Sequence, residues 1–454
     1  MKTETKPCEL TIAEASSAIA KGELTSTQLV NSCLERIDVL EEKIKAWALV
    51  DREGALKAAN RLDRELRQGK GRSPLHGIPL GIKDIFYTAG LRTEAGSPFW
   101  SGFVPSYDAA TVTRLKEAGA VILGKTHTAQ FAYIDPAPTC NPWNTDHTPG
   151  GSSSGSGAGV AAGMCLAALG SQTVGSVLRP AAYNGIVGFM PYLGRISTYG
   201  VVPVSWTLDH IGILARTVTD TAIVFQTIAG YDPRDLYSLD MPVPDCLKNL
   251  EKQKAPRLGL VRKYFFEHAD DEMRRHTEEV VERLRRAGAR VEEITPPPSF
   301  ATIRDIGRTI MAVEAATNHL EMFTKHRDEY GPKIKELIEE GLKTSATDYA
   351  KALQTRLQQR ADMEPLLHQV DALLTPGATS AAPFSLASTG SAAMQGPWSI
   401  LGVPAISLPT GLNKDSLPLA IQLSAPPKAE DHLLAVARWC EKALDVHLRP
   451  PLAS

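Results

Sequence analysis

Three separated polar residues suggest acyl-transfer chemistry. Lys83 lies in the apolar segment Gly77–Asp84, and Ser152 lies in a Gly/Ser-rich run at 149–157. Ser176 follows a second group of small residues, 24 positions after Ser152. Burial disfavours the ammonium form of lysine and lowers its pKa, so a buried amine can act as a base near neutral pH. Two serines and such a lysine suggest a Ser/Ser/Lys hydrolase, which cleaves acyl bonds without a metal ion or a histidine.

Each of these residues also has a purely structural interpretation. A lysine on a strand is usually a solvated charge, but the isoleucine and leucine neighbours of Lys83 favour burial. A Gly/Ser run is often a flexible linker. Here it precedes the small, apolar stretch Gly157–Gly170, which we expect to be a buried core helix. Ser176 could cap the next helix, an interpretation that becomes minor once Lys83 and Ser152 are considered with it.

Three other motifs fit the Gly/Ser run poorly. Its glycines are spaced as in a P-loop, but Ser156 stands where that loop needs lysine. A dinucleotide fingerprint at 157–162 lacks a preceding strand. A nucleophile elbow at 151–155 also needs a strand directly before it, whereas residues 141–149 are rich in turn formers. The histidines form no metal-binding pattern, so we expect neither a metal ion nor a cofactor.

Helical and strand patterns alternate along the chain. Residues 10–70 read as helices, and the apolar stripe after Asp271 predicts another helix, followed by a charged helical region at 325–368. The pattern indicates an α/β fold with a sheet covered on both faces. The predicted strands are 78–85, 120–124, 257–261, 289–294, 371–375 and 403–408, with a further helix at 109–119.

Composition excludes several classes of protein. The 454 residues are 43% apolar and 22% charged, with a net charge of −2, so no strong field favours nucleic acid or anionic membranes. The 14 residues of 157–170 are too few to span a bilayer. We expect no signal peptide. Six scattered cysteines without a C-x-x-C pair suggest reduced core thiols and a cytoplasmic location.

The chain resembles the amidase signature family. The resemblance is strong from about 70 to 220, through Gly77–Asp84, Pro149–Gly157 and Gly170–Pro180, and weaker from 370 to 440. It implies a single α/β/α domain over 1–454, with a large mixed, twisted central sheet covered by helices on both faces. Its expected parts are N-terminal helices (1–70), a catalytic core (70–220), a variable helical, substrate-side region (221–370) and the C-terminal part of the core (371–454).

The resemblance also implies roles for individual residues. Ser176 would be the nucleophile, Ser152 would relay the proton from a cis peptide, and Lys83 would be the base. The backbone N–H groups of Thr173, Val174, Gly175 and Ser176 would form the oxyanion hole. Gly151, Ser153, Gln172 and Arg179 would support the site.

This sequence departs from the commonest family pattern beside the nucleophile. Gln172 stands where aspartate is usual, Val174 where glycine is usual and Leu178 where arginine is usual, with Arg179 one position later. A Gln-Thr…Arg-Pro pattern belongs to one branch of these amidases, so we interpret it as a variant. Valine would be strained if position 174 required a positive φ.

The expected function is hydrolysis of amide C–N bonds in a small-molecule substrate through a serine acyl-enzyme. Met311, Met394, Trp398 and Ile400 hint at an apolar or aryl acyl group, and carbamates or esters would suit the same chemistry. One alternative is the glutamine-hydrolysing subunit of a tRNA-dependent amidotransferase, against which the uncharged Gln172 and Leu178 argue. A catalytically silent binding protein is the other. No nucleic-acid or membrane partner is expected, and a homodimer is left open.

Overall fold

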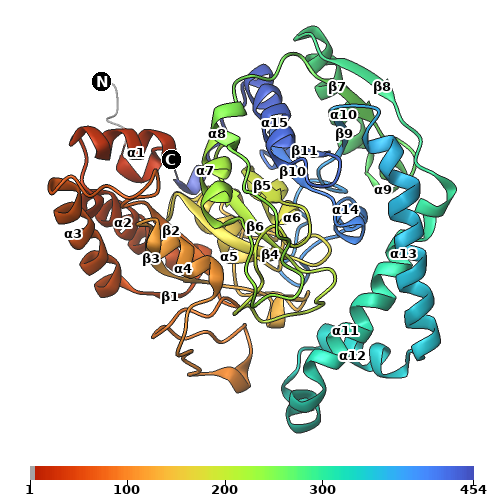
Figure 1. Ribbon diagram of the computed structural model, residues 1–454, viewed down its shortest axis with the longest axis horizontal. Coiled ribbons are helices and arrows are strands. Elements are labelled where there is room, and N and C mark those ends of the chain that lie inside the picture. Colours follow the sequence, from red (N-terminus) through yellow and green to blue (C-terminus); the bar gives the residue numbers. More distant parts are fainter. Residues whose placement is uncertain (1–5, 454) are drawn as a thin grey trace.

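A single mixed sheet of 11 strands runs through the computed structural model, which describes residues 6–453 (Figure 1). The strand order is β1-β3-β2-β4-β6-β5-β10-β11-β9-β7-β8. The strands are β1 (Trp47–Val50), β2 (Pro79–Lys83), β3 (Val121–Thr126), β4 (Ala167–Gln172), β5 (Val187–Met190), β6 (His210–Ala215), β7 (Arg257–Leu260), β8 (Arg290–Glu293), β9 (Ala372–Pro376), β10 (Ala405–Leu412) and β11 (Pro418–Ser424).

Helices pack on both faces of this sheet. The helices α5 and α6 contact β4, β5 and β10, while α7 and α15 lie against β5, β6 and β10 (Figure 1). The α-helices are α1 (Ile12–Lys21), α2 (Ser26–Ile44), α3 (Arg52–Arg67), α4 (Ala110–Glu117), α5 (Ser154–Ala161), α6 (Leu178–Asn184), α7 (Val218–Ile228), α8 (Cys246–Asn249), α9 (Phe265–His268), α10 (Asp271–Arg286), α11 (Ile303–His326), α12 (Pro332–Lys343), α13 (Ala346–Leu367), α14 (Gly396–Leu401) and α15 (Glu430–Leu444). The predicted α/β class, with a mixed sheet covered on both faces, is confirmed.

The centre of the sheet is built from short, apolar strands buried along their whole length. Strand β2 pairs in parallel with β3 on one side and β4 on the other, and every residue of the three strands is buried. Continuous apolar runs of this kind are what a parallel sheet covered on both faces requires. The carboxyl ends of β2 and β4 therefore meet at one edge of the sheet.

The sequence predictions fail in two segments of the N-terminal half of the chain. Residues 10–70 are not all helical, because β1 lies between α2 and α3. The expected single helix over Gly157–Gly170 is also wrong: α5 ends at Ala161 and β4 begins at Ala167. Gly163, with φ +72°, makes the turn that separates them. The same boundary shows that Gly170–Gln172 is strand rather than part of a turn.

Besides β1 and β4, the strands β5, β6 and β11 have no counterpart among the predicted ones. The long arm formed by α11, α12 and α13 projects beyond the sheet at the right of Figure 1.

All six cysteines are free and buried. Between residues 6 and 453, no helix combines the length and apolar character needed to cross a bilayer. The leader prediction concerns the first residues of the chain, of which 1–5 lie outside the described part.

Candidate active site

The parallel pairing of β2 and β4 brings Lys83 to the second serine-bearing segment. Ile82 pairs with Leu169, so the next positions along both strands place Lys83 beside Gly170 and Ser171. The Lys83 Nζ atom lies 2.8 Å from Ser152 Oγ and 2.8 Å from Ser171 Oγ. The lysine therefore has two hydroxyl partners, one from the Gly/Ser-rich run and one from the end of β4.

The loop before α5 holds Ser152 against the nucleophile segment. The peptide bond between Gly151 and Ser152 is cis. The Ser153 N–H donates to the Ser176 carbonyl at 3.3 Å, and the Ser153 hydroxyl donates to the Ser171 carbonyl at 3.3 Å. These contacts place the Ser152 and Ser176 segments side by side. Within residues 6–453 no hydrogen bond joins the two serine hydroxyls, and Ser176 Oγ has no protein partner.

Exposure decreases from the predicted nucleophile to the predicted base. Ser176 is 5% exposed, whereas Ser152 and Lys83 are fully buried. Burial lowers the pKa of Lys83 well below its ordinary value; the charge of Asp209 raises this pKa, and that of Arg179 lowers it. A neutral Lys83 amine can donate to one hydroxyl and accept from the other. Ser176 is therefore the most accessible of the three residues, and Lys83 lies in surroundings that disfavour its charged form.

The segment from Thr173 to Ser176 exposes its backbone N–H groups. Gln172 Oε1 accepts the N–H groups of Val177 and Leu178, both at 2.9 Å, so these first amides of α6 are already occupied. In the described chain, the N–H groups of residues 173–176 donate to no protein acceptor. Such preorganised donors suit an oxyanion. Val174 is absent from the non-glycine residues with positive φ, so its side chain causes no left-handed strain.

Two buried side chains hold the backbone around these donors. The Gln172 amide nitrogen donates to Ser399 Oγ at 3.0 Å. Arg179 donates to the carbonyl oxygens of Gly151 at 2.5 Å and Gly390 at 2.8 Å. Burial lowers the pKa of Arg179 to about 10. Gln172 therefore fixes the start of α6, while Arg179 fixes the peptide that precedes Ser152.

A cleft of about 560 Å³ opens beside the nucleophile segment and is bordered by Val174 and Arg179. Of the residues expected in the pocket, Met311 and Ile400 line it, but Met394 and Trp398 do not: they are fully buried in the core. The other lining residues combine apolar and cationic side chains. They are Tyr133, Ile134, Tyr264, His268, Ala301, Arg304, Asp305, Arg308, Gly390, Ser391, Ala392 and Gly396.

Sequence reasoning missed Ser171 and Asp209 as site residues. Ser171 contacts Lys83 directly, and Asp209 accepts a hydrogen bond from Thr173 Oγ1 at 2.6 Å. The signal for Ser171 was its place at the end of a strand, which is visible only once β4 is recognised and paired with β2. Asp209 lies in the segment Leu208–His210, through which the family resemblance continues only weakly, and its contact with Thr173 joins residues 36 positions apart.

Comparison with known proteins finds matches along almost the whole chain. The family model described as "Amidase" matches residues 28–434. Two curated relatives, each a subunit of glutamyl-tRNA(Gln) amidotransferase, are similar along almost their whole length. The protein from Geobacter metallireducens is 35% identical, and that from Chloroflexus aggregans is 36% identical; in both cases 97% of this chain and 98% of the relative are covered.

Two solved structures share the fold. The peptide amidase from Stenotrophomonas maltophilia superposes with a TM-score of 0.87 at 30% identity, covering 98% of this chain and 99% of the other. A structure described as a vestigial protein complex, which reveals the origins of an s-triazine catabolic enzyme, gives a TM-score of 0.91 at 27% identity. It covers 97% of this chain and 100% of the other.

Proposed function

Since the chain belongs to the amidase family, we propose that it hydrolyses amide C–N bonds through an acyl-enzyme on Ser176. The observation that carries the proposal is the contact between Lys83 Nζ and Ser152 Oγ at 2.8 Å, inside a site where Lys83 is fully buried. The free N–H groups of residues 173–176 add the electrostatic part of the chemistry. Fold alone would not justify an activity, but this constellation does.

The contact between Lys83 and Ser152 supports the first step of a two-hydroxyl proton relay, which is complete once Ser176 Oγ comes within reach of Ser152 Oγ. Neutral Lys83 accepts the Ser152 proton, and Ser152 accepts the proton of Ser176 as Ser176 Oγ attacks the substrate carbonyl. The carbonyl oxygen becomes an oxyanion in reach of the exposed N–H groups, each of which is typically worth about 2.7–4 kcal/mol in the transition state. Ser171 keeps the Lys83 amine oriented while its proton count changes.

Collapse of the tetrahedral intermediate breaks the C–N bond. The proton held on Lys83 returns through Ser152 to the leaving nitrogen, which departs as ammonia or an amine. Water then attacks the acyl-enzyme ester by the same relay, giving the carboxylic acid and restoring Ser176. Because Lys83 starts and ends neutral, its lowered pKa is what keeps the cycle running near neutral pH.

Two substrate classes suit this chemistry, and different observations favour each. The curated relatives favour glutamine hydrolysis within an amidotransferase, because they are subunits of that assembly and match almost end to end. The residues beside the nucleophile favour small apolar or aryl amides, with carbamates and esters as related substrates. There, Leu178 is an uncharged core residue, and Met311 and Ile400 line the cleft.

One activity screen separates these functions. Glutamine, aliphatic amides, aryl amides, carbamates and esters are assayed with the protein alone, and then with the partner subunits of a glutamyl-tRNA(Gln) amidotransferase added. Hydrolysis of aryl or aliphatic amides by the protein alone supports a free-standing amidase. Glutamine turnover that rises with the partners, together with co-purification, supports the amidotransferase role. Ser176→Ala is the control for both.

A catalytically silent binding protein is disfavoured by the intact Lys83–Ser152 contact. A fluorophosphonate tests this directly, because attack by Ser176 Oγ forms an O–P bond and expels fluoride. Labelling of Ser176, located by mass spectrometry, supports the acyl-enzyme; an unlabelled protein supports the catalytically silent binding protein.

The free, buried cysteines support a reducing, cytoplasmic environment for the enzyme.

A further inference from the structure

Asp209 occupies a position that the acyl-enzyme chemistry does not use directly. It lies just before β6 and accepts three hydrogen bonds from two directions. The Thr173 hydroxyl, in the oxyanion segment, donates to Oδ1 at 2.6 Å. The N–H groups of Val204 and Ser205 donate to Oδ2 at 2.8 and 3.0 Å. One carboxylate thus ties the oxyanion segment to the 204–207 loop.

That loop is in turn held by a second carboxylate, Glu314 on α11. Glu314 is fully buried and accepts from the hydroxyls of Ser205 and Thr207, from the Thr207 N–H, and from the Tyr349 hydroxyl. Four donors on one buried carboxylate give it a single favourable position, since an unpaired charge there would be costly. The 204–207 loop therefore cannot shift without breaking contacts at Glu314.

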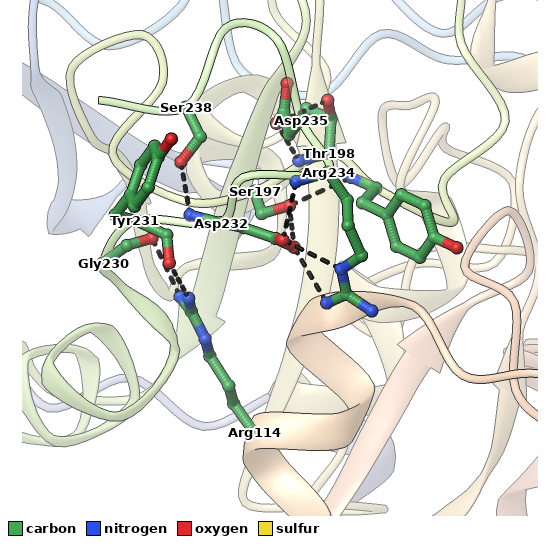
Figure 2. A network of polar contacts seen from close by, with 10 residues as sticks. Arg114, Ser197, Thr198, Gly230, Tyr231, Asp232, Arg234, Asp235 and Ser238 are labelled. Atoms are coloured by element: carbon green, nitrogen blue, oxygen red, sulfur yellow. Dashed lines mark hydrogen bonds and ion pairs between the residues drawn. The ribbon is translucent and has the colours of Figure 1, made fainter. Parts of the chain in front are cut away.

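The 204–207 loop belongs to the connection between β5 and β6. An earlier part of this connection, at residues 197 and 198, is held by contacts that do not involve Glu314. Figure 2 shows Ser197 donating to Asp232 at 2.9 Å and the Thr198 N–H donating to Asp235 at 2.6 Å. Arg114 on α4 fixes the 230–231 backbone that carries these carboxylates. The segment between β5 and β6 is thus clamped at both ends, which makes it a rigid base for Asp209.

Helix α11 also forms a wall of the substrate cleft. Arg304, Arg308 and Met311 line the cleft from the same helix that carries Glu314. The chain of contacts runs from the cleft wall through Glu314 and the 204–207 loop to Asp209 and Thr173. Hydrogen bonds to ionised groups are the strong ones, so this chain has the stiffness needed to hold backbone donors in place.

We propose that Asp209, secured through the 204–207 loop by Glu314, is a positioning residue that holds the oxyanion segment in place through Thr173. The inference rests on the proposed amide hydrolysis and adds a function for residues outside the Lys83–Ser152–Ser176 group. It requires that removing either end of the Thr173–Asp209 bond slows attack by Ser176 without removing any group that exchanges protons with the substrate.

Charge provides a second, separable effect of Asp209. The carboxylate faces Lys83 on β2 and raises its pKa, while Arg179 on α6 lowers it. Glu314 on α11 is the other charge facing Asp209, whose own pKa is raised to about 6 by burial. Asn at position 209 removes the negative charge that stabilises the Lys83 ammonium, so the pKa of Lys83 decreases. The acid limb of the pH–rate profile should therefore move to lower pH. Thr173→Val removes the hydrogen bond but keeps the carboxylate, so it should move that limb less than Asp209→Asn does.

The test uses the rate of fluorophosphonate labelling of Ser176, measured by mass spectrometry from pH 5 to 9. This readout needs no knowledge of the natural substrate. Asp209→Asn and Thr173→Val are compared with Asp240→Asn, which removes an exposed carboxylate, and Thr317→Val, whose hydroxyl bonds only within α11. Glu314→Gln tests the contribution of the contacts that hold the 204–207 loop.

We expect Thr173→Val and Asp209→Asn to slow labelling about 10- to 100-fold, less than the loss of a whole oxyanion donor. The double variant should be no slower than the slower of the two single variants, because both changes act on the same contact between residues 173 and 209. Glu314→Gln should slow labelling several-fold, and both controls should match the wild type. Where an amide substrate is found, kcat should fall in the same order with KM little changed.

The outcomes separate this inference from the proposed function. If wild-type Ser176 does not label, the acyl-enzyme assignment fails and the inference fails with it. If the wild type labels and the folded Thr173→Val and Asp209→Asn variants label within twofold of it, only the positioning role is overturned. Circular dichroism and thermal melting confirm that each variant is folded. If Asp209→Asn alone does not fold, Thr173→Val decides the question.

Discussion

Replacing Lys83 by methionine should abolish activity and yet stabilise the protein increasingly as pH falls. Methionine has a similar length and is apolar, so it suits a site that is fully buried. An unfolded lysine binds a proton below about pH 10.4. Folded Lys83 stays neutral down to its lowered pKa, because burial disfavours the ammonium form.

Between those two pKa values the unfolded state holds one more proton than the folded state. The free energy of unfolding of the wild type therefore decreases as pH falls, by about 1.4 kcal/mol per pH unit. If Lys83 is neutral at pH 7, as the proposed relay requires, the wild type should lose about 2.7 kcal/mol from pH 9 to pH 7 relative to Lys83→Met, since the variant has no amine to protonate. Groups other than Lys83 titrate in both proteins and largely cancel in the difference.

Urea unfolding at pH 7, 8 and 9 measures this difference for the two proteins side by side. The matched control is Lys43→Met, which removes an exposed lysine on α2 and should give a difference that does not change with pH. A constant gap between wild type and Lys83→Met over the same range would refute the reasoning. It would mean that Lys83 is charged in the folded protein and cannot be the base.

Three further outcomes follow from the same geometry. Ser176→Ala should lower turnover more than about 1,000-fold with an unchanged melting temperature; activity equal to wild type would remove Ser176 from the mechanism. Ser171→Ala removes one of two hydrogen bonds to the Lys83 ammonium, worth about 1.5–3 kcal/mol, so the acid limb of kcat/KM should shift about 1–2 pH units lower. An unshifted limb would contradict this. Gln172→Leu leaves two α6 amides without an acceptor and should cost about 1–3 kcal/mol of stability in denaturant unfolding, with no loss arguing against the capping role.

The parts of the fold that the sequence predicted are those with a strong local pattern. Strand β2 was recognisable because its apolar run has turn formers on both sides, and α10 because its apolar stripe has helical spacing. Gly157–Gly170 was misread because small residues pack equally well in a helix and in a buried strand. Only the positive φ at Gly163 marks the change, and glycine alone does not reveal its φ.

The site was predicted as far as single residues carry information. Lys83, Ser152 and the nucleophile segment stand in recognisable surroundings, and the structure brings their backbones together. Ser171 depends on the register between β2 and β4, and Asp209 depends on a contact 36 residues away in the chain. Contacts of this kind come from tertiary packing, so no reading of local composition would have found them.

The residues proposed for the proton relay and many of those that line the cleft come from different parts of the fold. Lys83, Ser152 and the donors at 173–176 all come from the edge of the sheet where β2 and β4 end, and each is held by buried contacts. Other lining residues of the cleft come from α11 and α14, which carry no recognised motif. Changes on those helices can alter the acyl group without disturbing the relay. Substrate differences from the amidotransferase relatives should therefore be sought there, and the Glu314 contact is the point where such changes would begin to affect catalysis.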